Sequence, residues 1–271
     1  MMETLISRLQ ERLDSRNDAK TRAWWEAYMK GVIPFRGVKM EAIRQELHAW
    51  LAAEGIAQLL SGEEQKALAL SLFRESCSED KLAGVLYFAE VLVPCGLVDW
   101  RADLPRLGAL FVEGHIYEWG TCDWLCVKVL GPLAAREGPE CARAISEWRR
   151  ADNMWQRRAA GVAFVNLAPR GEANFPGFTD MLLETCAATV RDPQRFAQTG
   201  TGWVLRELSR AEPERVAAFV SDNIGYLSRE AFNYATARLP DEVKSALKER
   251  IGKPDAKRAQ LKPRPGSVAA Q

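Results

Sequence analysis

The stretch LAGVLYFAEVLV, residues 82–93, carries its leucines, valines and Ala89 at positions spaced three or four apart. This spacing places the apolar side chains on one face of an α-helix. Similar stripes recur within residues 42–51, 216–220 and 243–247. No segment shows the two-residue alternation and β-branched enrichment that are typical of a strand. The sequence therefore predicts an all-α fold.

Capping residues and prolines mark helix starts along the chain. Ser61-Gly62-Glu63-Glu64 predicts a capped helix with an acidic first turn, and Asp152-Asn153 predicts a second helix start. Pro193, Pro213 and Pro240 each fit the first turn of a helix. Together these signals predict roughly a dozen helices joined by short loops.

The helices form consecutive hairpins of roughly 35 to 45 residues, which suits a divergent two-helix repeat of the HEAT type. A compact helical bundle is the alternative, but its central helix would be apolar on all sides, and no segment has that pattern. We therefore expect a curved array of HEAT-like repeats, an α-α superhelix, over residues 1–252. Residues 253–271 are rich in Pro, Lys and Ala, which predicts a basic, flexible tail that is either solvated or in contact with nucleic acid.

Composition narrows the class of protein. The 271 residues include 37 basic and 36 acidic ones, so net charge alone identifies no partner. Charge is nonetheless uneven, because residues 41–80 are acidic and residues 141–170 are basic. No apolar run is long enough to span a bilayer, and residues 1–16 are too charged for a secretory signal. With six scattered cysteines, the chain is expected to be a cytoplasmic monomer with reduced thiols.

Residues 119–124, WGTCDW, are the first segment that could carry chemistry. Trp119 and Asp123 are four positions apart, so on a helix they lie about 40° apart and share a face. A carboxylate among apolar neighbours needs either a cation or a wet groove, because burying it unpaired is costly. The alternative is a surface aspartate beside a core tryptophan.

Two further segments combine aromatic, basic and small residues. In residues 152–160, DNMWQRRAA, the adjacent Arg157 and Arg158 point about 100° apart on a helix. One arginine could therefore face a buried acid or a phosphate while the other faces water, or both could form surface ion pairs. In residues 199–207, TGTGWVLRE, two glycines before Trp203 allow either room for a ligand or a tight helix–helix contact.

The sequence offers little support for a metal or cofactor. His48 and His115 are the two histidines, and neither lies in an HExxH pattern. Cys122 and Cys126 could share a helix face, but their spacing is not that of a zinc site. Walker, GxGxxG and GxSxG motifs are also missing. We expect no metal and no cofactor.

A fourth segment, residues 24–38, WWEAYMKGVIPFRGV, predicts a turn at Pro34-Phe35-Arg36-Gly37 and aromatic side chains that belong to the core. Its AYM and PFRGV pieces are followed in order by WxTxD from residue 119, WQRRAA from 155, GWVLRE from 202 and LSREA from 227. This ordered set, over about residues 20–240, resembles the AlkD-type DNA alkylation repair family, the HEAT-like repeat DNA glycosylases.

The resemblance implies a concave, basic face that holds duplex DNA, and it implies a role for each matching residue. Asp123 matches the catalytic carboxylate of the family. Trp119 and Trp203 match the aromatics that flank the sugar and backbone of the lesion, Arg158 matches an arginine that contacts phosphate, and Tyr28 matches an aromatic that lines the cleft. The activity implied is hydrolysis of the N-glycosidic bond of cationic N3- and N7-alkylated purines, without a metal or cofactor.

Three positions depart from the family pattern. Gly120 stands where better-known members carry an acid, Glu118 stands where they carry a second tryptophan, and Thr199 replaces a basic residue. These changes remove positive charge and aromatic surface from the expected cleft. They leave open a second function, a non-catalytic HEAT-like module that binds DNA or a protein partner.

Overall fold

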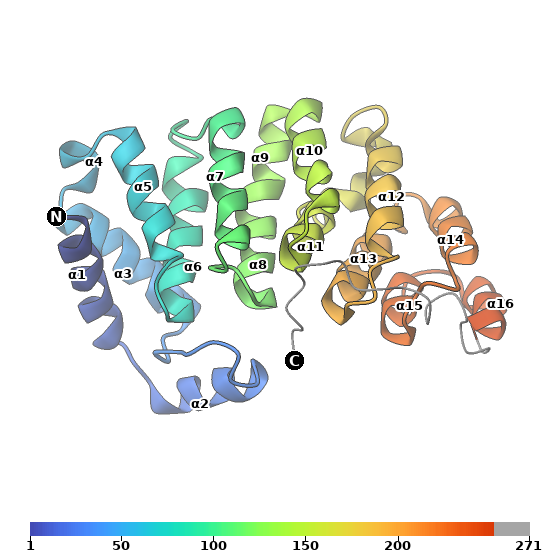
Figure 1. The fold of residues 1–271 in the computed structure, drawn as a ribbon, viewed down its shortest axis with the longest axis horizontal. Coiled ribbons are helices and arrows are strands. Elements are labelled where there is room, and N and C mark those ends of the chain that lie inside the picture. Colours follow the sequence, from blue (N-terminus) through green and yellow to red (C-terminus); the bar gives the residue numbers. More distant parts are fainter. Residues whose placement is uncertain (252–271) are drawn as a thin grey trace. The chain divides into compact units, whose positions relative to one another are not determined.

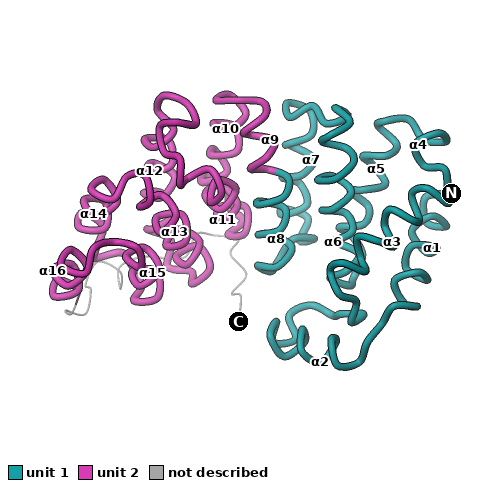
Figure 2. Tube along the Cα trace, turned by 180° about the vertical axis from the view of Figure 1, so that it is seen from behind, with its two compact units in different colours: residues 1–129 teal, residues 130–271 magenta. Residues whose placement is uncertain are grey.

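The computed structural model describes residues 1–251, and these contain helices and loops but no strand. The predicted all-α class is therefore confirmed, with sixteen α-helices instead of about twelve (Figure 1). The chain divides into two compact units, residues 1–129 and the residues from 130 onward (Figure 2). The predicted tail, residues 253–271, lies outside the described residues.

Unit 1 is a stack of helices that pack against one another in pairs. Helix α3 packs against α1 and α6, and α5 packs against α6. The apolar stripe of residues 82–93 runs through α6 and the π-helical turn η1, and Leu86 and Leu92 are fully buried. The helices of unit 1 are α1 (Met2–Asp14), α2 (Ala19–Tyr28), α3 (Met40–Ala53), α4 (Ile56–Leu59), α5 (Gly62–Leu72), α6 (Ser78–Tyr87), η1 (Phe88–Leu92), α7 (Trp100–Val112) and α8 (Trp119–Leu125).

Unit 2 continues the pairing of helices. Helix α13 is its central element and packs against α11, α12, α14 and α15, while α9 pairs with α10. Its α-helices are α9 (Gly131–Glu137), α10 (Pro139–Ser146), α11 (Met154–Val162), α12 (Phe178–Thr189), α13 (Arg195–Leu208), α14 (Pro213–Asp222), α15 (Arg229–Ala235) and α16 (Asp241–Ile251). The shorter turns are η2 (Cys126–Leu130), which crosses the boundary between the units, η3 (Glu147–Arg150) and η4 (Ala168–Ala173).

Most of the predicted helix starts are confirmed. Ser61 forms a capping box with Glu64 at the start of α5, Asn153 caps α11, and Pro213 is the first residue of α14. The first-turn prediction is wrong for Pro193 and Pro240, which precede α13 and α16. Gln194 occupies the N-cap position of α13, so Pro193 lies outside that helix. None of the described helices is long and apolar enough to cross a bilayer.

Candidate functional site

Helix α8 carries Trp119 and Asp123, and the carboxylate of Glu118 fixes its start. Glu118 is 1% exposed and has an extended backbone. Its Oε1 accepts the backbone N–H of Thr121 at 2.7 Å, and its Oε2 accepts that of Gly120. These bonds satisfy two of the N–H groups that a helix start leaves unpaired. Glu118 therefore holds the first turn of the helix on which Asp123 lies.

Gly120 and Glu118 depend on each other. A Cβ atom at position 120 would lie 2.9 Å from Glu118 Oε2 and 3.6 Å from Met29 Cε. Any side chain there would displace the capping carboxylate. The two departures noted in the sequence therefore form one local arrangement, in which Glu118 uses the space next to Gly120.

Glu118 also brings a second acidic group close to Asp123. Burial raises the pKa of Glu118, the hydrogen bonds from Thr121 and Gly120 oppose that rise, and the negative charge of Asp123 adds to it. Lys81 attracts this carboxyl, although burial lowers the pKa of Lys81. The Lys81 ammonium donates to the carbonyls of Phe73 at 2.5 Å and His115 at 3.0 Å. Asp123 thus has a second carboxyl group near it, buried and with a raised pKa.

Trp119 and Asp123 are both half-buried, and Trp119 leads to an aromatic patch on α2. The ring of Trp119 meets that of Tyr28 edge-on, with centroids 6.2 Å apart. Tyr28 in turn stacks on Trp24 at 5.3 Å. Tyr28 is 54% exposed and Trp24 is 58% exposed. Unit 1 thus brings three of the predicted site residues, Tyr28, Trp119 and Asp123, to adjoining elements α2 and α8.

The expectation that the aromatics of residues 24–38 belong to the core is right for Phe35 and wrong for Trp24 and Tyr28. Every residue of α2 keeps part of its surface exposed, and the buried Met29 follows directly after the helix. Phe35 packs with Met29 in a small cluster against which Trp25 and Trp119 lie. The periodicity of α2 resembles that of a core helix, but only its end is packed.

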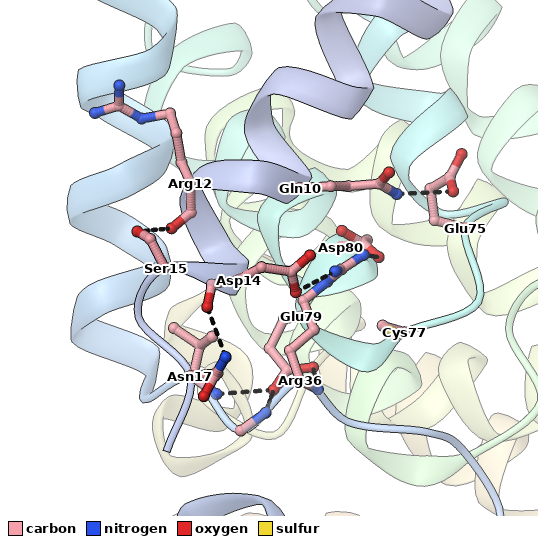
Figure 3. Close-up of polar contacts among 12 residues, drawn as sticks. Gln10, Arg12, Asp14, Ser15, Asn17, Arg36, Glu75, Cys77, Glu79 and Asp80 are labelled. Atoms are coloured by element: carbon pink, nitrogen blue, oxygen red, sulfur yellow. Dashed lines mark hydrogen bonds and ion pairs between the residues drawn. The ribbon is translucent and has the colours of Figure 1, made fainter. Parts of the chain in front are cut away.

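A buried polar network, which the sequence analysis missed, shapes the loop after α2 (Figure 3). Glu79 accepts the backbone N–H groups of Arg36 at 2.9 Å, Gly37 at 2.8 Å and Val38 at 3.0 Å. The Arg36 guanidinium pairs with Asp80 at 2.8 Å and Asp14 at 2.6 Å. Burial raises the pKa of Asp80 and Arg36 opposes that rise. The predicted turn at residues 34–37 is therefore held by α6. The sequence signal for this network was the adjacent pair Glu79 and Asp80, which comes directly before the apolar run of residues 82–93.

In unit 2 both arginines of α11 are buried, so the prediction that one of them faces water is wrong. The Arg157 guanidinium donates to Asp192 Oδ2 at 2.8 and 2.5 Å and to the carbonyls of Ala151 and Asp152. Arg158, 7% exposed, donates from Nη1 to the Phe196 carbonyl at 2.7 Å. Helix α11 packs against both α12 and α13, which leaves neither arginine on an open face.

The glycine-rich start of the α13 motif mainly serves packing. A Cβ atom at Gly202 would lie 2.6 Å from the Ala231 carbonyl of α15, so the tight helix–helix contact is confirmed there. A Cβ atom at Gly200 would lie 3.0 Å from Arg158 Nη1. Thr199 Oγ1 accepts from the same Nη1 at 3.3 Å, which gives this departure from the family pattern a structural role. Trp203 is half-buried on the same helix.

Comparison with known proteins identifies a family and one solved structure of similar fold. A family model described as DNA alkylation repair enzyme matches residues 9–239. The chain belongs to this DNA alkylation repair family. A solved structure, described as a predicted DNA alkylation repair enzyme from Enterococcus faecalis, aligns with a TM-score of 0.69 and 18% identity. The alignment covers 83% of this chain and 98% of that one, and at this identity it supports the fold. A search of curated proteins gave no match.

For a member of the DNA alkylation repair family, the side chains of α8 provide a carboxylate next to aromatic rings. All six cysteines are free thiols, and Cys122, Cys126, Cys141 and Cys186 are buried. Among residues 1–251 no group of three or more His, Cys, Asp or Glu side chains could hold a metal ion. The groups that α8 offers for chemistry are the half-buried Asp123 carboxylate and the neighbouring aromatic rings.

Proposed function

We propose that the chain is a DNA glycosylase that hydrolyses the N-glycosidic bond of cationic N3- and N7-alkylated purines in duplex DNA. The observation that carries this proposal is the half-buried Asp123, which shares α8 with Trp119 next to the exposed Tyr28. Membership of the DNA alkylation repair family supports a repair role.

The proposed chemistry needs a negative group near the sugar. An alkylated purine already carries positive charge and leaves readily, so the group to stabilise is the deoxyribose as it becomes an oxocarbenium ion. The Asp123 carboxylate would stabilise that charge and orient the attacking water. The ring of Trp119 would present its electron-rich face to this cation and exclude bulk water, and Trp203 of unit 2 would contact the DNA. Contributions of about 2–4 kcal/mol from each group would suffice for such a labile bond.

DNA binding in this proposal rests on a few contacts. Arg158 would contact a phosphate of the duplex. Because Arg158 is 7% exposed and its Nη1 is bonded to the Phe196 carbonyl and to Thr199 Oγ1, this contact would require the guanidinium to become more exposed on DNA binding. Tyr28 would line the cleft. Phosphate contacts predict affinity that falls with salt and depends little on sequence.

The second candidate is a non-catalytic module that binds DNA or a protein partner. Gly120, Glu118 and Thr199 favour it, because these departures remove positive charge and aromatic surface from the expected cleft. The two candidates differ in one outcome, the release of a free base.

The test measures release of 7-methylguanine and 3-methyladenine from methylated duplex DNA. Wild type should release both bases, and Asp123→Asn should be slower by about 10²-fold or more while it retains duplex binding. Glu26→Gln is the matched control, because it removes one negative charge from the exposed side of α2 without touching Asp123. Equal release by wild type and Asp123→Asn would place the chemistry elsewhere. Salt-sensitive binding without any release would favour the second candidate.

A further inference from the structure

Unit 2 carries a group of arginines to which the proposed chemistry assigns no role. Helices α13 and α15 pack side by side (Figure 1). At or just beyond the C-terminal ends of these helices, Arg206, Arg210 and Arg238 all form ion pairs with the carboxylate of Glu207, at 2.8, 3.5 and 3.5 Å. Among residues 1–251, no other acidic side chain pairs with any of the three. We call these three residues the arginine cluster.

The arginine cluster carries more positive charge than its ion pairs balance. The single charge of Glu207 neutralises one guanidinium, which leaves an excess of two positive charges. Three like charges around one carboxylate also repel one another, so a further anion would stabilise the group. The side chains are 29% exposed for Arg206, 50% for Arg210 and 39% for Arg238, against 12% for Glu207. The unbalanced charge therefore lies on side chains that a ligand can reach.

The arginine cluster also has N–H donors to offer. Arg206 and Arg210 both reach Glu207 through Nε, and their Nη groups have no hydrogen-bond partner among residues 1–251. A guanidinium presents its N–H groups in a planar fork that matches two oxygens of a phosphate. Several such forks on one surface suit an anion with many oxygens, and a chain of phosphates more than a single carboxylate.

An aromatic ring lies next to the arginine cluster. Tyr234 of α15 is 41% exposed, and the centre of its ring is 5.8 Å from the guanidinium carbon of Arg206. Gly202 allows this approach, because a Cβ atom there would lie 2.9 Å from the Cβ of Tyr234. The half-buried Trp203 precedes Arg206 by three positions and shares its face of α13. Arginines interleaved with aromatic rings are typical of surfaces that bind nucleic acid.

We propose that the arginine cluster binds backbone phosphates of duplex DNA, with Tyr234 against the adjoining sugar and Glu207 holding the guanidiniums in position. The inference rests on the proposed function in one respect, that the ligand is DNA, and membership of the DNA alkylation repair family supports this. It does not depend on Asp123. Unlike Arg158, which is 7% exposed, the cluster can contact phosphate without first becoming more exposed.

The test measures binding of a short undamaged DNA duplex to the full chain over a range of salt concentrations. Arg210→Gln and Arg238→Gln should each weaken binding about tenfold at low salt. Each should also reduce the slope of log affinity against log salt by about one, because one phosphate contact is lost. Arg215→Gln is the matched control, since it removes the same charge from a one-to-one pair with Asp180 on α14 and α12. Unchanged slopes in the cluster variants, or equal changes in all three variants, would overturn the proposal.

Two further measurements separate the proposed role from a structural one and from a site for a free anion. Arg210→Lys keeps the positive charge and should retain most of the salt slope, whereas loss equal to that of Arg210→Gln would overturn the proposal. Calorimetric titration with inorganic phosphate should show no saturable binding. Saturable phosphate binding that Arg210→Gln abolishes, in a chain that does not bind the duplex, would assign the cluster to a free anion and overturn the proposal.

The undamaged duplex keeps this inference separate from the glycosylase proposal. Base release by wild type, together with unchanged salt slopes in Arg210→Gln and Arg238→Gln, would refute the inference about the arginine cluster alone. Reduced slopes in these variants, together with no base release by wild type, would refute the glycosylase alone.

Discussion

The two halves of the predicted site differ in how deeply they lie in their own units. In unit 1, Asp123 and Trp119 are half-buried, and Tyr28 is exposed. In unit 2, Arg157 and Arg158 are buried and bonded to carbonyls, a carboxylate and a hydroxyl of neighbouring elements. Sequence motifs of similar composition thus serve two purposes. One presents side chains near the surface, and the other joins helices.

This difference follows from the helices that carry the motifs. Helix α8 is seven residues long, is capped by Glu118 and packs within unit 1 against α6. Helix α11 lies against α12 and α13, and α13 lies against four helices. Substitutions in the α8 motif should therefore change function more than stability, and substitutions in the α11–α13 motifs should change stability first.

The largest effect on stability should come from the buried pair Arg157–Asp192. Asp192→Ala leaves the Arg157 guanidinium buried without its carboxylate, and such a loss typically costs about 3–5 kcal/mol. Glu230→Ala breaks the exposed Arg195–Glu230 pair of the same unit and should cost about 0.2–1 kcal/mol. Urea unfolding of the two variants measures both free energies.

These two unfolding free energies test whether the α11 motif serves mainly to join helices, in contrast to the α8 motif. Equal losses for Asp192→Ala and Glu230→Ala would mean that Arg157 finds other partners or water once its acid is gone. The hydrogen bonds of the α11 motif would then contribute less to the stability of unit 2 than their number indicates. A large loss confined to Asp192→Ala would sharpen the contrast.

A smaller effect should separate the glycines of the two motifs. In Gly202→Ala the new Cβ meets a backbone carbonyl of α15 at 2.6 Å, which cannot move without shifting that helix. Overpacking of this kind costs about 1–3 kcal/mol, partly offset by about 1 kcal/mol of helix propensity. In Gly120→Ala the Cβ meets the end of the Glu118 side chain, which can turn away.

Thermal unfolding of the two alanine variants tests this difference. Gly202→Ala should lower the melting temperature, and Gly120→Ala should lower it less. Gly120→Ala should still reduce base release, because it disturbs the cap that orients α8. If Gly120→Ala were the more destabilising of the two, the Glu118 side chain could not turn away, and it would be as fixed as the α15 backbone next to Gly202.

The sequence predicted the helical class, most helix starts and the shared helix of Trp119 and Asp123, because these depend on local spacing. It did not predict that Arg157 and Arg158 are both buried. A helix with neighbours on two sides buries residues 100° apart, and the number of neighbours is a tertiary property. Exposure of Trp24 was missed for the opposite reason, since α2 is rich in aromatic residues but buries none of its residues fully.

The Glu79 network and the cap formed by Glu118 were missed for a different reason. Both depend on carboxylates that accept backbone N–H groups, and the residue types do not show which backbone groups lie close enough to donate. From the sequence, Glu118 was interpreted only as the loss of a tryptophan that better-known family members carry at this position. Its burial next to Gly120 gives the physical reason for both residues.

The smallest effect should be a dependence of stability on pH that has opposite signs for two capping glutamates of unit 1. Burial raises the pKa of Glu118 in the folded chain, so folding favours its protonated form. Its contribution is largest below the unfolded pKa of about 4.3 and is lost as the pH rises through the raised folded pKa. Relative to Glu118→Gln, wild type should therefore lose unfolding free energy as the pH rises from about 4 to 7.

Glu64 provides the control with the opposite sign. Hydrogen bonds from the backbone and side chain of Ser61 lower the pKa of Glu64, so its contribution is present above the unfolded pKa and is lost as the pH falls. Relative to Glu64→Gln, wild type should therefore gain stability as the pH rises toward about 4.3. Other titrating groups, such as Asp80, are present in both members of each pair and cancel in the difference. Slopes of the same sign would show that Glu118 is solvated in solution, and α8 would then begin without its buried cap.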